Sequence, residues 1–215
     1  MLPAIDQLKA RIESAVPAAK VEIHPNDTPA AQPSLIINRE ALFEVAHFLR
    51  DDPELKFDYA SNVTGVDWLD LVTKEKMKVK KVVDGVEKEV EETIEKKRAG
   101  YLEVVYHLFS MSLKHGPIIL RVRTGNRTDD SNIPSVTPIW RGAEFQEREI
   151  YDLYGVKFEG HPDLRRILMW DGYTEHPMRK DYVEPDDYEY EPTPHDDVLA
   201  KTKCHWPSME GTTGR

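Results

Sequence analysis

The amino-acid sequence predicts an α+β fold, in which a mixed or antiparallel sheet with flanking helices precedes an extended C-terminal tail. Three observations lead to this prediction. Apolar residues recur at helical spacing in three segments, and shorter apolar runs bounded by turn residues indicate strands between them. From Asp181 onward the composition changes: the stretch EPDDYEYEPTPHDDV is acidic and rich in proline, and it shows no period that could form a core.

The N-terminal quarter is predicted to form two helices and a strand. Residues 2–16 place leucine, isoleucine and valine on roughly one helical face, and the proline-rich residues 24–34 indicate a loop. The run LIIN, residues 35–38, has the length and composition of a short buried strand. A second helix follows, with Asn38 as its N-terminal cap and Asp51-Asp52-Pro53 as its end.

The middle of the chain is predicted to form sheet strands with a long insertion. Residues 57–71 indicate a strand and a turn, and residues 101–111 and 117–124 indicate two antiparallel strands. Between the first of these strands and the antiparallel pair, residues 72–98 are dense in lysine and glutamate. Within them, Asp84-Gly85 flanked by valines is a hairpin turn signal. The insertion could serve as a charged arm for a partner, but charge runs of this kind usually face water.

Residues 140–155, WRGAEFQEREIYDLYG, carry the strongest helix signal in the chain. Arg148 follows Glu144 and precedes Asp152 by four residues, so two ion pairs along the helix surface are expected. Gly155 suits the left-handed position that commonly follows the last residue of a helix.

The totals argue against several classes of protein. A net charge of −10 over 215 residues argues against a nucleic-acid binder, because affinity for nucleic acid depends on lysine and arginine. The single cysteine, Cys204, can form neither an internal disulfide nor a site of several thiolates. The N-terminus contains Asp6 and Glu13 and does not resemble a signal peptide, and no apolar run approaches 18 residues. The expected location is the cytoplasm, with peripheral docking to a membrane left open.

A metal site is weakly supported. His161, Asp163, Glu175 and His176 offer nitrogen and oxygen ligands. However, each histidine precedes a proline, which holds it extended, and the two do not have the i,i+4 spacing of a helical metal motif. The simpler interpretation is that each imidazole is hydrogen-bonded to backbone or to a carboxylate.

Motifs for phosphate binding and for catalysis are also weak. Residues 155–162 have the glycine spacing of a P-loop but lack the lysine and hydroxyl residue that follow it. Cys204 and His205 are adjacent only in sequence, in a polar tail. Glu147 and Glu149 could form an acid–base pair, but residues two apart point to different sides of a helix.

A basic cluster follows the strongest helix. Asp163 is predicted to cap a short helix whose apolar residues pack inward, which leaves Arg165 and Arg166 facing outward or sideways. Arg179 and Lys180 add to the cluster. The cations could pair within the chain with Glu147, Glu149 and Asp152, or they could contact a partner. The two interpretations are compatible, because an internal clamp can fix the surface that a partner contacts.

Two segments of this region carry a resemblance to a known family. They are EREIYDLYGVKFEGHPDLRRILM at 147–169 and HPMRKDY at 176–182, with VYHLFS, PSVTPIW and GVDW earlier in the chain. Together they closely resemble the C subunit, the "thirty-kilodalton" peripheral-arm subunit, of NADH–quinone oxidoreductase, respiratory complex I. The resemblance covers about residues 35–185.

The resemblance implies an α+β domain whose extended C-terminal segment lies on neighbouring subunits. It implies a complex that moves electrons from NADH through FMN and iron–sulfur clusters to a quinone, coupled to ion pumping, with no cofactor in this chain. The implied partners are the large, hydrogenase-like subunit of the quinone site and neighbouring iron–sulfur subunits, with no nucleic acid. Membrane contact would be indirect, on the cytoplasmic side of the cell membrane or on the equivalent matrix side.

These considerations give a division into a globular domain, residues 1–160, and a signature segment with a partner-binding tail, residues 161–215. The predicted structural and interface residues are Glu147, Arg148, Glu149, Asp152, Gly155, His161, Asp163, Arg165, Arg166, His176, Arg179, Lys180 and Asp181. One alternative is the equivalent subunit of a membrane-bound hydrogenase or of a quinone reductase with another donor. The other is a stand-alone enzyme using His161 and His176. The insertion is longer than a minimal family member needs, and no role is assigned to Cys204, His205 or the tail after about residue 185.

Overall fold

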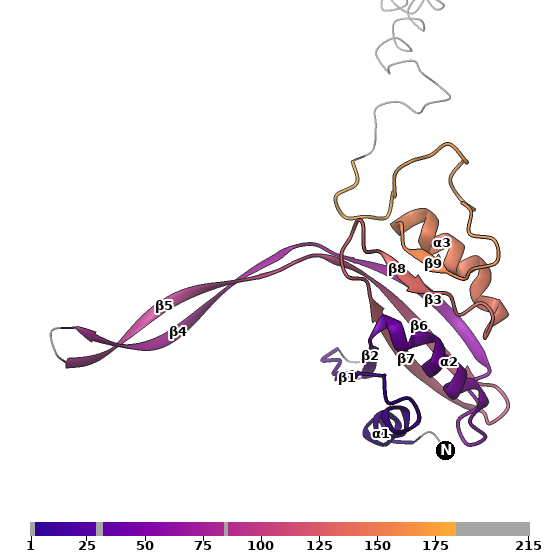
Figure 1. Cartoon of the computed structure of the whole chain (residues 1–215), viewed down its shortest axis with the longest axis horizontal. Coiled ribbons are helices and arrows are strands. Elements are labelled where there is room, and N and C mark those ends of the chain that lie inside the picture. Colours follow the sequence, from indigo (N-terminus) through magenta and orange to yellow (C-terminus); the bar gives the residue numbers. More distant parts are fainter. Residues whose placement is uncertain (1–2, 29–31, 84–85, 184–215) are drawn as a thin grey trace, which may run out of the picture. The chain divides into compact units, whose positions relative to one another are not determined.

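A mixed five-stranded sheet forms the centre of the fold in the computed structural model, which describes residues 3–28, 32–83 and 86–183 (Figure 1). In spatial order its strands are β1 (Val21–His24), β2 (Ser34–Ile37), β7 (His115–Arg123), β6 (Tyr101–Ser110) and β3 (Tyr59–Trp68). The pair β2–β7 is parallel and the other three pairs are antiparallel. The predicted mixed sheet is therefore confirmed, as are the antiparallel strands β6 and β7.

Three helices accompany the sheet: α1 (Ile5–Ala15), α2 (Leu42–Asp51) and α3 (Glu144–Tyr154). Short 3-10 turns precede two of them, η1 (Arg39–Ala41) before α2 and η2 (Arg141–Ala143) before α3. Leu8 of α1 and Val45 of α2 are buried in one core with Tyr106 of β6 and Leu120 of β7. Because strand residues alternate between faces, the neighbours of Tyr106 and Leu120 along each strand face the opposite side of the sheet.

The predicted helices that correspond to α1, α2 and α3 are confirmed, but two details near the N-terminus differ. The sequence interpretation missed β1, whose four residues VEIH are too few to establish a period and end next to a proline. Asn38 precedes the helical turn but does not cap it with its side chain. Its Oδ1 instead accepts the backbone N–H of Lys20 at 2.8 Å, which ties β2 to the segment before β1.

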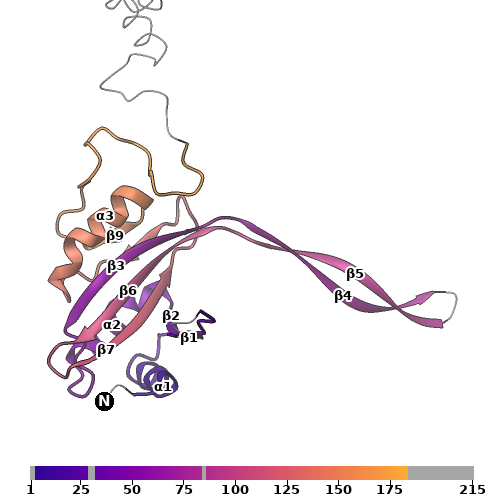
Figure 2. The ribbon, with the colours of Figure 1, turned by 180° about the vertical axis from the view of Figure 1, so that it is seen from behind.

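The insertion forms the predicted hairpin from β4 (Leu71–Val83) and β5 (Val86–Arg98), seen from both sides in Figures 1 and 2. The two strands pair antiparallel from Leu71↔Arg98 to Val83↔Val86, and residues 84–85 of its turn lie outside the described residues. The hairpin continues the β3–β6 ladder, whose last pair is Trp68↔Tyr101.

A smaller parallel pair, β8 (Asn132–Pro134) and β9 (Lys157–Glu159), flanks α3 in sequence. The chain divides into one unit from Met1 to Lys180 and a second from Asp181 to Arg215. The predicted extended tail, with Cys204 and His205, lies outside the described residues from position 184. The division at residue 160 therefore stays a prediction. Within the described ranges, no helix is long and apolar enough to cross a membrane.

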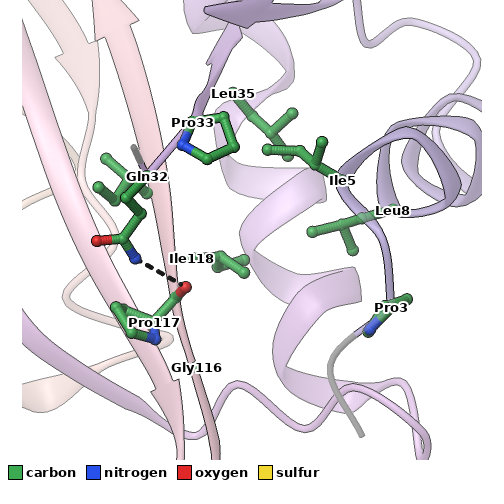
Figure 3. A pocket seen from close by; sticks show the side chains of 10 residues that line it. Pro3, Ile5, Leu8, Gln32, Pro33, Leu35, Gly116, Pro117 and Ile118 are labelled. Carbon is green, nitrogen blue, oxygen red and sulfur yellow. Dashed lines mark hydrogen bonds between the residues drawn. The ribbon is translucent and has the colours of Figure 1, made fainter. Parts of the chain in front are cut away.

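A cavity of about 460 Å³ lies between α1 and strands β2 and β7 (Figure 3). Ile5, Leu8, Leu35 and Ile118 contribute apolar walls, and Gln32 donates from Nε2 to the carbonyl of Pro117 at 3.3 Å. None of the residues that line this cavity belongs to the predicted site. The cavity and the signature segment are therefore separate features of the chain.

Candidate functional site

The C-terminal end of α3 is enclosed by the signature segment, residues 161–180. The last carbonyls of a helix have no partner within the helix and carry partial negative charge. Here the carbonyl of Asp152 accepts Nη1 of Arg166 and Nδ1 of His176, both at 3.0 Å. The carbonyl of Leu153 accepts the N–H of Met178 at 3.1 Å, and that of Tyr154 accepts Nε of Arg179 at 2.7 Å. Two arginines and a histidine thus satisfy this helix end.

The carboxylate of Asp152 anchors the same segment from the side of the helix. Its Oδ2 accepts three consecutive backbone N–H groups, from Ile167, Leu168 and Met169, at 3.0, 2.7 and 2.9 Å. Its Oδ1 lies 2.6 Å from Nη1 of Arg166. Burial disfavours the charge, but these N–H donors and the guanidinium outweigh it and lower the pKa of Asp152. Asp152 is therefore ionised at neutral pH, and it holds three successive peptide units in place.

The predicted short helix after Asp163 is wrong. Residues 163–169 contain turns and bends without helix. The N–H groups of 167–169 bind Asp152, while the carbonyls of Arg165 and Arg166 accept Nε and Nη2 of Arg148 at 3.1 and 3.2 Å. The side chains of α3 therefore occupy the backbone groups that a helix here would need. As a result Leu168, predicted to face inward, is 59% exposed.

Arg148 and Asp152 do not form the ion pairs predicted along the helix surface. Nη1 of Arg148 lies 3.7 Å from Asp163, and Asp152 pairs with Arg166. Glu144 pairs instead with Arg141, at 3.2 Å. The charges of α3 thus connect mainly to the signature segment, and the predicted pairing of the basic cluster within the chain is confirmed for Arg166.

Glu147 does not join this charge network. It is fully buried, and its carboxylate accepts the hydroxyls of Ser135 and Thr137 at 2.5 and 3.0 Å and the N–H of Val136 at 2.8 Å. Nε2 of His161 lies 3.9 Å away. Burial raises the pKa of Glu147, although these hydrogen bonds favour its charged form. Glu147 therefore fastens α3 to the loop that follows β8.

We expect Glu147 to give the chain a stability term that falls as the pH rises. Its pKa is higher in the folded than in the unfolded state, so the term is fully present below the unfolded-state pKa and is lost as the pH rises through the folded-state pKa. Urea unfolding of the wild type and of Glu147→Gln between about pH 4 and about pH 8 measures it. The stability of the wild type minus that of Glu147→Gln should decrease with pH; a constant difference would contradict the assignment.

Gly155 is required at the end of α3 for two reasons. Its φ is +79°, in the left-handed region, which confirms the predicted position after the helix. A Cβ at this position would lie 2.4 Å from Nε2 of His176 and 2.6 Å from Nη2 of Arg179. The absence of a side chain thus lets His176 and Arg179 reach the helix end.

The two histidines of the metal and enzyme hypotheses lie at opposite ends of α3. Nε2 of His161 lies 3.0 Å from the carbonyl of Glu144, and Nδ1 of His161 accepts the N–H of Asp163 at 3.0 Å. His176 contacts the carbonyl of Asp152, eight residues later, and burial lowers the pKa of His176. Within the described residues no three His, Cys, Asp or Glu side chains gather in a metal-binding group. The interpretation of both imidazoles as hydrogen-bonded to backbone is confirmed.

The remaining predicted residues are at or near the surface. Glu149 is exposed, and the Arg165 side chain is 70% exposed and pairs with Asp163 at 2.9 Å. The backbone N–H of Lys180 donates to Oδ2 of Asp67 at 2.8 Å. Asp181, the first residue of the second unit, is exposed.

Sequence reasoning missed the role of Asp67. This buried carboxylate on β3 accepts Nε and Nη2 of Arg127, both at 2.7 Å, besides the N–H of Lys180. Asp67 lies within the GVDW run, so the run itself was a signal. Its partners, 60 and 113 residues away, could not be inferred from spacing.

Several apolar side chains of α3 and of the signature segment are exposed at the surface of this site. Phe145, Ile167, Leu168 and Met178 are 60%, 38%, 59% and 53% exposed. Ile167 and Leu168 are two of the residues whose N–H groups Asp152 holds. Their positions are therefore fixed by the carboxylate although no helix or strand contains them.

A family model and curated relatives assign the chain to one family. Residues 35–188 match the family described as "Respiratory-chain NADH dehydrogenase, 30 Kd subunit". The chain is 35% identical over 172 residues to the C subunit of NADH-quinone oxidoreductase from Roseiflexus castenholzii, a match that covers 80% of each chain. It is 37% identical over 148 residues to that of Roseiflexus sp. (strain RS-1), covering 69% of this chain and 68% of the relative. A solved trypsin-resistant fragment of Nqo5 is 26% identical with a TM-score of 0.45, covering 74% of this chain and 98% of the fragment.

Proposed function

The chain belongs to the family of 30 kDa subunits of the respiratory-chain NADH dehydrogenase. We propose that it serves that complex as a structural subunit and does not itself catalyse a reaction. The complex passes electrons from NADH to quinone. In this proposal FMN, the iron–sulfur clusters and the quinone are bound by partner subunits, and this chain holds those partners in register.

The observation that carries the proposal is the interlock between α3 and the signature segment. Asp152 alone engages Arg166 and three successive backbone N–H groups, and Arg148 holds two carbonyls of the same stretch. Side chains whose hydrogen bonds are made to nearby backbone groups are suited to fixing the conformation of that backbone. That shape presents exposed Ile167, Leu168 and Met178 to a partner.

The partner proposed for this surface is the large, hydrogenase-like subunit of the quinone site, with small iron–sulfur subunits beside it. The same segment exposes the apolar side chain of Leu168 and the charged side chain of Arg165, and a mixture of exposed apolar and charged groups is typical of a protein contact. In this arrangement the chain is peripheral, on the cytoplasmic or equivalent matrix side of the membrane, and it meets the membrane only through the complex.

The alternative of another membrane-bound complex is less supported, because the relatives at 35% and 37% identity are C subunits of NADH-quinone oxidoreductase. Purification of the chain with its partners from its own membranes tests the donor. A co-purifying flavoprotein with a nucleotide site supports NADH as the donor. A hydrogenase in its place would contradict the proposal.

We expect Arg166→Ala to reduce the amount of assembled complex, because it removes contacts to the Asp152 carboxylate and to the carbonyls of Asp152 and Glu175. The spectra of the electron carriers in the complex that does assemble should be unchanged. Native gel electrophoresis of membranes and electron paramagnetic resonance of the purified complex measure the two quantities separately.

Arg165→Ala is the matched control for folding of the chain, because it removes the adjacent arginine, whose side chain is 70% exposed. Asp163→Ala should have a smaller effect than Arg166→Ala, since the Asp163 carboxylate is 46% exposed. Normal assembly of Arg166→Ala together with the loss of a redox signal would contradict a structural role.

A further inference from the structure

A second polar surface lies on the sheet face opposite α1 and α2. We call it the Trp68 platform and define it by Trp68, Arg98, Tyr101, Arg123 and Lys180. The rings of Trp68 and Tyr101 stack with centroids 6.1 Å apart. The guanidinium of Arg98 lies 5.6 Å from the Trp68 ring and 5.5 Å from the Tyr101 ring. Arg123 lies 5.0 Å from the Tyr101 ring, and Nζ of Lys180 lies 5.6 Å from the Trp68 ring.

Only part of this positive charge is balanced within the described part of the chain. Glu103, fully buried beneath the platform, pairs with Arg123 at 3.1 Å and with Arg121, and it accepts Nε1 of Trp68 at 2.9 Å. Arg98 and Lys180 are exposed, and among the side chains that the structure describes (those of residues 74–94 and 96 are outside this set) they contact aromatic rings and form no ion pair. Two cations are thus held above a pair of rings, and no carboxylate among the described side chains pairs with them.

The platform is a built surface, because its parts come from separate segments of the chain. Trp68 ends β3, Arg98 ends β5, Tyr101 begins β6 and Arg123 ends β7. The buried Glu103 fixes the indole and one guanidinium, and the hydrogen bond from the backbone of Lys180 to Asp67 fixes the segment that carries this lysine. Contact with the ring faces favours the cations where they lie.

We propose that the Trp68 platform binds a carboxylate-rich segment of a partner protein. A guanidinium is matched in shape to a carboxylate. Each of the two cations beside the aromatic rings can bind one carboxylate and donate hydrogen bonds to it. A short acidic peptide can lie on the platform and interact mainly with its positive charge. An anionic membrane surface or a nucleic acid extends further and also meets a chain whose net charge is −10, so these larger polyanions are disfavoured. That the partner belongs to the same complex rests on the proposed function; the recognition of carboxylates does not.

The test measures binding of fluorescein-labelled octaglutamate to the purified full-length chain by fluorescence anisotropy near neutral pH. We expect saturable binding that weakens when the salt rises from about 50 mM to about 300 mM, as screening shortens the range of the attraction. The double variant Arg98→Glu/Lys180→Glu should bind at least about tenfold more weakly. Neither residue contributes to the interlock at α3.

The control is Lys114→Glu/Lys157→Glu, which changes the net charge equally at two exposed lysines away from the platform. Equal weakening in both double variants would show a response to net charge and would overturn the proposal. If a chain that ends at Val183 bound octaglutamate tenfold more tightly than the full chain, the acidic residues 184–197 would be the occupant, and the partner protein would be refuted.

A third arm distinguishes a membrane surface. The full chain is sedimented with vesicles of phosphatidylglycerol and phosphatidylcholine. If the wild type bound these vesicles, Arg98→Glu/Lys180→Glu did not, and the wild type did not bind octaglutamate, the platform would be assigned to lipid and the proposal would be overturned. None of these results depends on assembly of the respiratory complex. Failure here would therefore leave the Arg166→Ala experiment to decide the proposed function.

Discussion

Replacement of Asp152 by alanine is expected to lower the free energy of unfolding of the chain by about 3–5 kcal/mol near neutral pH, the usual cost of removing one partner of a buried ion pair. The variant leaves the guanidinium of Arg166, whose side chain is 11% exposed, without its carboxylate. It also leaves the N–H groups of residues 167–169 without the acceptor that they share. Urea denaturation of the purified chain measures the loss.

Glu149→Ala is the matched control, since it removes an exposed carboxylate from the same helix, and we expect a change within about 0.5 kcal/mol. The pH dependence adds an independent signature. The pKa of Asp152 is lowered in the folded chain, so its contribution is present above the unfolded-state pKa and is lost as the pH falls through the folded-state pKa. Asp152→Asn should lack this acid-dependent loss. A change below about 1 kcal/mol in Asp152→Ala would mean that water replaces the carboxylate without consequence.

The second large effect is expected for Gly155→Ala, which should lower the free energy of unfolding by about 2–5 kcal/mol. The left-handed backbone at φ +79° costs about 1–2 kcal/mol with any Cβ. The new methyl group would also overlap His176 and Arg179, and overlap in a packed region costs about 1–3 kcal/mol. Because the side chains of His176 and Arg179 hold the signature segment to α3, assembly of the complex should fall as well.

Gly160→Ala separates the two causes. Gly160 has the same φ of +79°, but no atom lies within 4 Å of the position where its Cβ would be. This variant should show the backbone cost alone, about 1–2 kcal/mol. Equal thermal and urea stability of the two variants would show that the close approach of His176 and Arg179 does not matter.

Regular periodicity made most elements of the fold predictable. The helical spacing of α1, α2 and α3, the Asp84-Gly85 hairpin signal and the runs that form β6 and β7 each reflect a short-range rule that tertiary contacts reinforce. In contrast, β1 is only four residues long, and it depends on its pairing with β2 along its full length. No local signal specifies such a strand.

The signature segment shows where local rules fail. Asp163 and the spacing of Leu164, Ile167 and Leu168 predict a helix, and nothing in that stretch contradicts it. The donors and acceptors that such a helix needs are bound instead by Asp152 and Arg148, which lie 11 and 15 residues before Asp163 along the chain. The sequence could therefore single out Arg148, Asp152 and Arg166, whereas their partners required the fold.

Glu147 shows that local sequence rules also fail to identify a buried carboxylate. Its place in the charged run made Glu147 a candidate partner of the basic cluster, yet its carboxylate is buried among two hydroxyls and a backbone N–H. The Trp68 platform was missed as well, because its members are separated by up to 112 residues in the chain, and nothing in the GVDW or HPMRKDY runs indicates that Trp68 and Lys180 meet.

The point at which the hairpin joins the sheet has a practical consequence for protein engineering. Trp68 and Tyr101 face each other across the ladder, as do Leu71 and Arg98, so the chain departs and returns about one strand spacing apart, about 5 Å. An excursion that closes on itself in this way can be trimmed, extended or exchanged for a reporter domain in pairs of residues while the register of β3 against β6 is kept. The length of the hairpin can therefore change while the point at which it leaves the sheet stays the same.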